Sequence, residues 1–148
     1  MSNRALVCAS ILTPFLLLAA TAAAQPVPER LHGSWRIDAG ASFEHRAGLA
    51  KLDGIGDEQL RSLFERRAES PPIEFSADAF SLGASPEARF ACRTRYADAA
   101  VVYLSCHRDD HYFTLAVVVV GEGIRLLSSD TDDTDVFVWS RTAAPATD

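Results

Sequence analysis

The feature that most restricts the fold of this chain is a series of short alternating segments that fills its second half. From residue 73 to residue 141, apolar side chains alternate with polar ones, which is the pattern of strands with one buried face. Gly, Asp, Ser or Pro residues separate the segments and favour turns. The pattern predicts seven consecutive strands, at 73–75, 80–82, 88–96, 101–108, 111–120, 123–129 and 135–141.

An eighth strand and a helical stretch precede this series. Residues 31–38 alternate with Trp35 on the apolar side, which predicts the first strand. Residues 57–69 carry apolar side chains at helical spacing, begin with acidic residues and are followed by two prolines, which predicts a helix. A second short helix is expected within 43–52. The sequence therefore predicts an all-β domain of about eight antiparallel strands, with a helix between strands 1 and 2.

The first 24 residues have the pattern of a cleaved secretory signal peptide. Arg4 supplies positive charge, the run 5–20 is uncharged and mostly apolar, and Ala22–Ala24 forms an A-x-A cleavage site. A membrane anchor is the less favoured interpretation, because Pro14 interrupts a run that is already too short to span a bilayer. We expect export to the periplasm or the medium, with a tether at 25–30, one domain at 31–141 and a flexible tail at 142–148.

Two cysteines beyond the leader test the register of the central strands. If a three-residue loop joins the fourth and fifth strands, Cys92 lies opposite Cys106 and Tyr96 lies opposite Val102. An even number of cysteines in an exported chain predicts a disulfide between them. A two-residue turn at 109–110 carries the same register into the sixth strand. The inner face then provides the expected lining of a ligand cavity, which is Phe90, Tyr96, Leu104, Phe113, Leu115 and Val117.

Eight short strands in a meander leave two unpaired edges, and closure into a barrel is the simplest way to remove them. An open sandwich is the alternative. The first strand carries Gly33-Ser34-Trp35, and Arg141 ends the last strand. This pattern resembles the lipocalins, whose first strand opens with G-x-W and whose final strand places a basic residue over that tryptophan. The chain is similar to compact lipocalin-like barrel domains of exported bacterial proteins, and the resemblance implies structural roles for Gly33, Trp35 and Arg141.

The residues that could carry other chemistry do not form a recognisable site in the sequence. His107 and His111 fall on a predicted hairpin, where their rings diverge, so no metal site is expected. The acidic stretch 128–135 lacks the central glycine and the later glutamate of an EF-hand calcium loop. Asp38, Glu44 and His45 could be combined as an acid–base set, but nothing in the sequence fixes their geometry. We expect neither catalysis nor a cofactor.

Composition and the resemblance leave two classes of function. A formal net charge of −6 argues against nucleic acid or an anionic membrane surface as the main partner. The first class is a non-catalytic barrel that binds a small apolar or amphipathic ligand. The alternative is a periplasmic or secreted protein-interaction module with a filled core, such as an envelope accessory or an inhibitor, whose partner is an envelope or extracellular protein. The bulky inward residues favour a filled barrel, because eight strands leave little room inside. The lipocalin-like pattern favours a ligand carrier.

Overall fold

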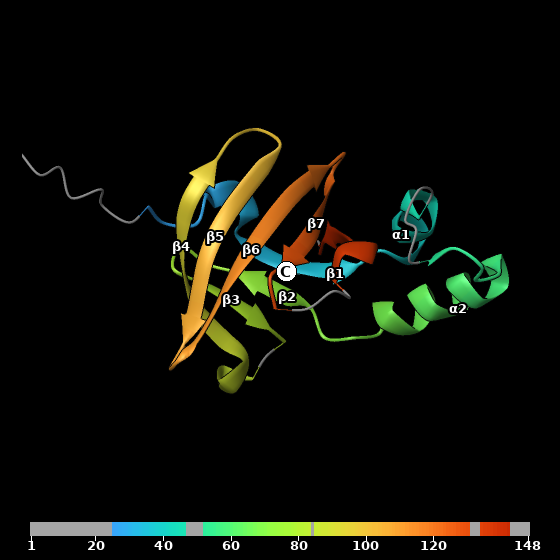
Figure 1. Ribbon diagram of the computed structural model, residues 1–148, viewed down its shortest axis with the longest axis horizontal. Coiled ribbons are helices and arrows are strands. Elements are labelled where there is room, and N and C mark those ends of the chain that lie inside the picture. The colour runs from blue at the N-terminus through green and yellow to red at the C-terminus, as the bar shows by residue number, and fades with distance from the viewer. Residues whose placement is uncertain (1–24, 47–51, 84, 131–133, 143–148) are drawn as a thin grey trace, which may run out of the picture.

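The protein is described by a computed structural model that covers residues 25–46, 52–83, 85–130 and 134–142. Its centre is a closed antiparallel barrel in which each strand pairs with the next and β8 returns to β1 (Figure 1). The expected closed barrel is therefore confirmed and the open sandwich is excluded. The strands are β1 (Gly33–Ile37), β2 (Ile73–Phe75), β3 (Ala79–Leu82), β4 (Arg89–Ala97), β5 (Val101–Arg108), β6 (His111–Val120), β7 (Gly123–Ser128) and β8 (Val138–Arg141).

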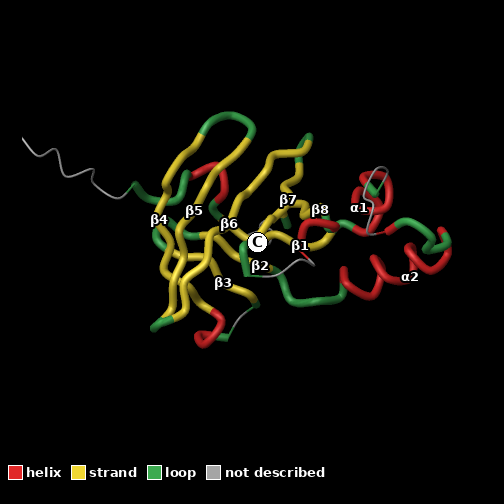
Figure 2. The backbone as a smooth tube through the Cα atoms, viewed as in Figure 1, coloured by secondary structure: helices red, strands yellow, loops and turns green. Residues whose placement is uncertain are grey.

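Two α-helices stand together on one side of the barrel, between β1 and β2 (Figure 2). The helix α2 (Asp57–Ala68) forms where its sequence pattern predicts it, and Leu60 and Phe64 are its buried side chains. The helix α1 (Ala39–His45) begins earlier than expected, because the Asp38 carboxylate accepts a hydrogen bond of 2.9 Å from the Ala41 amide and caps it. Short 3-10 turns that lie wholly within the described residues are η1 (Glu29–Leu31), η3 (Pro86–Ala88) and η4 (Thr134–Val136).

The central hairpin has the register that the cysteines predict over most of its length. Cys92 pairs with Cys106 across β4 and β5, and a disulfide joins them with their Cα atoms 4.1 Å apart. The two-residue turn before β6 is also confirmed, since Cys106 pairs with Phe113. The register then shifts at a bulge between Thr94 and Tyr96, so Tyr96 pairs with Tyr103 rather than with Val102.

One end of the barrel is closed by the segment that precedes β1. The prediction of a tether at 25–30 is wrong, because this segment packs against the barrel. The Thr94 amide donates to the Gln25 carbonyl at 2.9 Å, and the Val27 amide donates to Ala77 at 2.8 Å. Val27 and Leu31 are each 1% exposed. The segment therefore fills the end at which the β2–β3, β4–β5 and β6–β7 turns lie.

The lipocalin-like contact between the first and last strands lies at this closed end. The Arg141 guanidinium sits 4.5 Å from the centroid of the Trp35 ring, and Arg141 donates to the carbonyls of Arg30 and His32. The Trp35 indole donates to the Leu31 carbonyl at 2.9 Å. Gly33 has a φ of +114°, and a Cβ there would lie 3.1 Å from Arg141, so both backbone and space require glycine.

No helix in the described part of the chain is long and apolar enough to cross a membrane. The expected leader at 1–24 lies outside the described residues, as does most of the expected tail.

Candidate functional site

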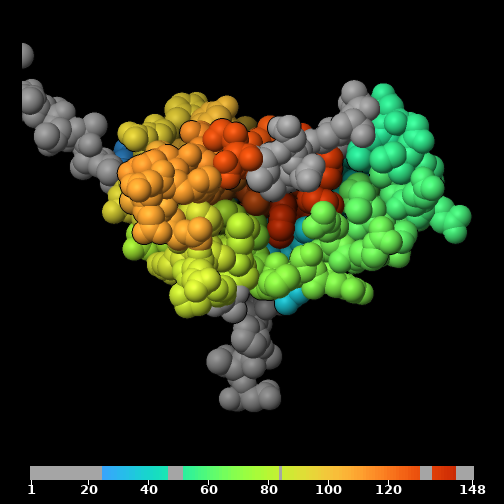
Figure 3. Space-filling view, turned by 60° about the horizontal axis from the view of Figure 1, so that its bottom comes forward, coloured from blue at the N-terminus to red at the C-terminus, as the bar shows by residue number. Residues whose placement is uncertain are grey.

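A pocket of about 450 Å³ opens into the barrel at the end opposite to the closed one. Its floor consists of buried apolar side chains, and its rim consists of exposed or half-buried ones. The space-filling view shows this face hollowed between the green helical side and the orange β6 side (Figure 3). The floor residues are Ile37, Ile73, Phe80, Phe90, Leu115, Leu126, Phe137 and Trp139; the rim and walls add Arg67, Ser70, Pro71, Leu82, Gly83, His111, Phe113, Ser128 and Asp130.

The chain topology explains why the pocket lies at this end. Strands β1, β3, β5 and β7 finish here, and β2, β4, β6 and β8 begin here. The connection between β1 and β2 holds both α-helices, so the helices stand beside the mouth rather than at the far end. The mouth of the pocket therefore lies on the same side of the barrel as α2.

One side of the pocket is an aromatic wall. The Phe90 ring packs edge-on against Phe113 with centroids 5.0 Å apart, and it stacks on Phe80 at 6.4 Å. The Arg108 guanidinium lies over the Phe90 ring, 4.8 Å from its centroid. Each ring is held by its neighbours, so the wall is preorganised for contact with an apolar group.

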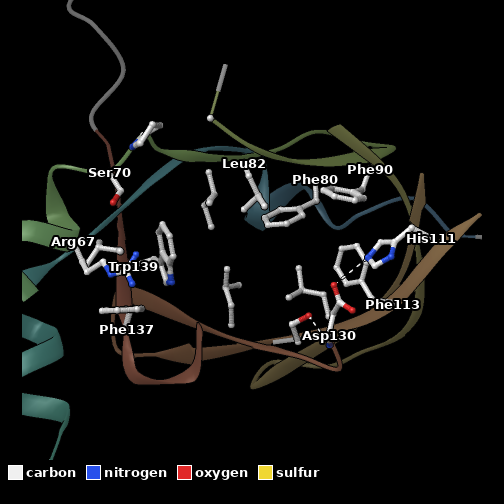
Figure 4. A pocket seen from close by; sticks show the side chains of 17 residues that line it. Arg67, Ser70, Phe80, Leu82, Phe90, His111, Phe113, Asp130, Phe137 and Trp139 are labelled. Carbon is white, nitrogen blue, oxygen red and sulfur yellow. Dashed lines mark hydrogen bonds and ion pairs between the residues drawn. The ribbon is translucent and has the colours of Figure 1, made fainter. Parts of the chain in front are cut away.

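His111 and Asp130 contact each other at the edge of this aromatic wall. His111 Nε2 lies 3.0 Å from Asp130 Oδ2, and the His111 ring also contacts Phe90 and Phe113 (Figure 4). The pair links the start of β6 to the segment after β7 across the rim. Because these two polar groups contact each other, the rest of this end of the pocket is mainly apolar.

The opposite end of the pocket holds polar side chains for which the described residues provide no hydrogen-bond partner. Trp139 is 7% exposed, and its indole Nε1–H is the one buried side-chain polar atom without a hydrogen-bond partner among the described residues. Leaving such a donor unpaired costs about 1–3 kcal/mol. Arg67 and Ser70 lie at this same end, in Figure 4 far from His111. Arg67 forms no ion pair or hydrogen bond through its side chain in the described part of the molecule.

The expected lumen residues divide between the two ends of the barrel. Phe90, Phe113 and Leu115 line the pocket. Leu104 and Val117 are fully buried but lie deeper along β5 and β6, toward the closed end, and they do not line it. The placement of Tyr96 in the lumen is wrong.

Tyr96 lies on the outer surface because of the bulge in β4. The extra residue turns the side chain outward, where it is 52% exposed and packs 6.2 Å from the Tyr103 ring. The Tyr96 hydroxyl donates to the Asp98 carboxylate at 2.7 Å, and this hydrogen bond raises the pKa of Tyr96. The same hydrogen bond, with those from the Val101 and Ala100 amides, lowers the pKa of Asp98.

Sequence reasoning missed the polar end of the pocket. The available signal is the period of two at Phe137 and Trp139 on the approach to β8, which is typical of side chains that share one face. Arg67 carries no comparable signal, because in the sequence it is one of two adjacent arginines near the end of the predicted helix. Its place at the pocket depends on how α2 packs against the barrel, which no local pattern in the sequence reveals.

The other candidate residues have structural surroundings. Asp38 caps α1 and accepts a hydrogen bond of 2.9 Å from the Ser140 hydroxyl. His45 stands in the same helix, and burial, with the nearby Arg125, lowers its pKa. His107 stacks on Tyr112 with centroids 5.4 Å apart on the outer face, away from His111. No cluster of three metal-ligating side chains occurs among the residues that the structure places.

Comparison with protein families, curated proteins and solved structures finds no match to this chain.

Proposed function

We propose that this protein is an exported, non-catalytic carrier that holds a small amphipathic molecule in the pocket beside α2. The observation that carries the proposal is the cavity of about 450 Å³ itself, whose size lies in the usual range of roughly 300–1,000 Å³ for small-ligand sites. Export is supported by the leader pattern and by the Cys92–Cys106 disulfide, which suits an oxidising compartment.

The barrel is densely packed at one end and hollow at the other, which supports a binding role. Bulky side chains fill the closed end, where Leu104, Val102 and Val117 are fully buried. The same barrel widens at the other end into a cavity with an apolar floor and a few polar groups on its rim. An apolar floor provides affinity through burial, and a few polar groups fix orientation.

The proposal is tested with an uncharged fluorescent probe, N-phenyl-1-naphthylamine, titrated into the disulfide-intact protein. We expect saturable binding with enhanced probe emission at one site per chain. Ser128→Phe places a ring on the pocket side of β7 and should abolish this binding. The matched control is Leu127→Phe, since Leu127 is the next residue along β7 and is exposed on the outer face.

The outcomes separate a pocket site from surface adsorption. Loss of binding in Ser128→Phe, with binding retained in Leu127→Phe, supports the carrier. No saturable binding to the parent protein, or equal binding by both variants, contradicts it.

The second candidate function is a protein-interaction module that uses the outer face of β4, β5 and β6. The exposed pair Tyr96 and Tyr103 and the exposed Tyr112, stacked on His107, favour it because tyrosine is enriched at interfaces. These groups contact one another across strands rather than surrounding a pocket for an anchor residue. Failure of the probe titration would make this face the leading candidate.

A further inference from the structure

The long strands of the barrel differ in charge from the rest of the molecule. The chain carries 20 acidic and 14 basic side chains. Strands β4 to β7, which the structure describes throughout, contain no Asp or Glu, and they carry Arg89, Arg93, Arg95, Arg108 and Arg125. Strands β4, β5 and β6 lie side by side on the side of the barrel away from α1 and α2 (Figure 1). An acidic protein therefore presents one basic wall.

Two arginines on this wall have no acidic partner. Arg89 pairs with Asp78 at 3.2 Å, whereas Arg93 and Arg95 are exposed in the same strand and form no ion pair among the described residues. Asp98 follows this strand, but its carboxylate accepts hydrogen bonds from its own loop. Because salt screens charges over about 8–10 Å, the local charge rather than the net charge of the chain acts on a partner at this face.

Strand pairing places Arg93 in a row of hydrogen-bond donors. Arg93 pairs with Ser105 in β5, and Ser105 pairs with Thr114 in β6. None of the three side chains is buried, and the strands that carry them are about 4.8 Å apart. A guanidinium and two hydroxyls can all donate hydrogen bonds to carboxylate oxygens. This polar row therefore suits an anionic partner.

The neighbouring row on the same face is apolar. It lies two residues away along β5, which is about 7 Å. The row crosses four paired strands and consists of Tyr96, Tyr103, Ala116 and Leu127. Its large side chains are exposed, at 52% for Tyr96, 43% for Tyr103 and 39% for Leu127. Contiguous exposed apolar side chains with a polar border are typical of an interaction site.

From these two rows we infer that the outer face of β4 to β7 binds an acidic polypeptide segment that also carries apolar side chains. The carboxylates contact Arg93 and Arg95, and the apolar side chains cover Tyr103 and Leu127. The closed barrel offers no free strand edge between β4 and β7, so side chains supply the contacts.

The apolar row favours a polypeptide over other polyanions. An anionic polysaccharide would match the charge of the polar row, but it has no apolar side chains to cover Leu127 and its neighbours. The inference is independent of the pocket. It gives a partner class to the outer face that is the second candidate function.

The test uses three fluorescein-labelled peptides of equal length, titrated with the disulfide-intact protein and followed by fluorescence anisotropy. The first peptide alternates Glu with Leu and Gly, the second has Gln in place of each Glu, and the third has Gly in place of each Leu. We expect the first to bind at least about tenfold more tightly than either of the others, because only it provides both charge and apolar area. Raising the salt concentration should weaken its binding.

Two double variants locate the binding. Arg93→Gln with Arg95→Gln removes both unpaired charges and should weaken binding of the first peptide about tenfold. Arg36→Gln with Arg66→Gln is the matched control, because it removes the same charge from exposed positions in β1 and α2 and should leave binding unchanged. Leu127→Ser should weaken binding several-fold.

The outcomes separate this face from general attraction between charges. Binding of the first peptide that is weakened by the β4 pair and retained in the control supports the inference. Absence of binding, equal binding of all three peptides, or equal loss in both double variants overturns it.

Competition tests the class of partner. If alginate or a thymidine oligonucleotide displaces the labelled peptide at a lower concentration than the unlabelled peptide does, the face belongs to another polyanion and the inference is overturned. Titration of the pocket with N-phenyl-1-naphthylamine tests the carrier function separately, so either proposal can fail while the other stands.

Discussion

The two ends of the barrel are built from the same strands but have opposite character. At the closed end, Val27 and Leu31 fill the space between the strands, and Trp35 is buried beneath Arg141. At the other end, a cavity of about 450 Å³ reaches down to Trp139. An eight-stranded barrel can be solid or hollow according to what its connections place at each end.

The two tryptophans show the difference most clearly. Both are nearly fully buried, at 3% exposed for Trp35 and 7% for Trp139. The Trp35 indole is satisfied by the Leu31 carbonyl, whereas the Trp139 indole has no partner among the described residues. The paired indole at the closed end thus contributes to stability, whereas the unpaired indole at the open end carries a desolvation cost.

The largest expected effect comes from removing the aromatic ring at the closed end. Trp35→Ala should lower the free energy of unfolding by about 3–5 kcal/mol, because it leaves a cavity under Arg141 and removes the bond to Leu31. Urea unfolding followed by circular dichroism measures the change. A free energy of unfolding equal to that of the parent would show that packing at the closed end does not stabilise the fold.

Reduction of the disulfide should have the next largest effect. Loss of the bond between Cys92 and Cys106, which are 14 residues apart, should cost about 3 kcal/mol by the loop-entropy argument. Intact-mass measurement before and after a reductant first establishes that the bond is present, and thermal melting then gives its contribution. Two free thiols in native exported protein would contradict the register of β4 and β5.

A matched pair of truncations compares the ends directly. Val27→Ala removes two buried carbon atoms at the closed end and should cost about 2 kcal/mol. Leu82→Ala, at the rim of the open end where Leu82 is 50% exposed, should change stability by less than about 0.5 kcal/mol. Equal effects in chemical denaturation would remove the distinction between a packed end and a hollow one.

The smallest expected effect concerns the β4–β5 loop at the closed end. The Asp98 carboxylate accepts hydrogen bonds from the Tyr96 hydroxyl and from the Ala100 and Val101 amides, and its pKa is lowered in consequence. A lowered pKa means that the folded state binds the proton less readily than the unfolded state. The stabilisation is therefore complete above the ordinary pKa of 3.8 and is lost as the pH falls through the lower folded value.

Asp98→Ala tests the direction of this pH dependence of stability. The variant should melt slightly below the parent at pH 7, and the difference should shrink in strongly acidic buffer. A difference that grows on acidification would contradict the assignment.

Much of the barrel follows from its sequence because alternation and turn length act together. A period of two assigns each side chain to a face, and the short loops at 98–100 and 109–110 fix the pairing of Cys92 with Cys106 and with Phe113. The bulge beside Thr94 escapes this reasoning, because no Gly or Pro marks it and a single extra residue reverses the face of Tyr96.

Two features could not be predicted in this way: the packing of the segment before β1, and the residues that line the pocket. Residues 25–30 have no periodic pattern, and the burial of Val27 comes from its contact with distant strands. The pocket likewise takes its lining from distant parts of the chain, since Arg67 and Trp139 lie 72 positions apart in the sequence. Only the packing of α2 beside the barrel mouth brings them together.

The contrast between a packed end and a hollow end is tested most directly by the two indole N–H resonances in ¹H–¹⁵N spectra of the isotopically labelled protein. Trp35 and Trp139 are the only tryptophans in the chain, so they report separately on the closed end and the open end. On titration with N-phenyl-1-naphthylamine, we expect the Trp139 indole signal to shift progressively to saturation while the Trp35 indole signal stays in place. A shift at Trp35 with none at Trp139, or no shift at either across the titration, would contradict it.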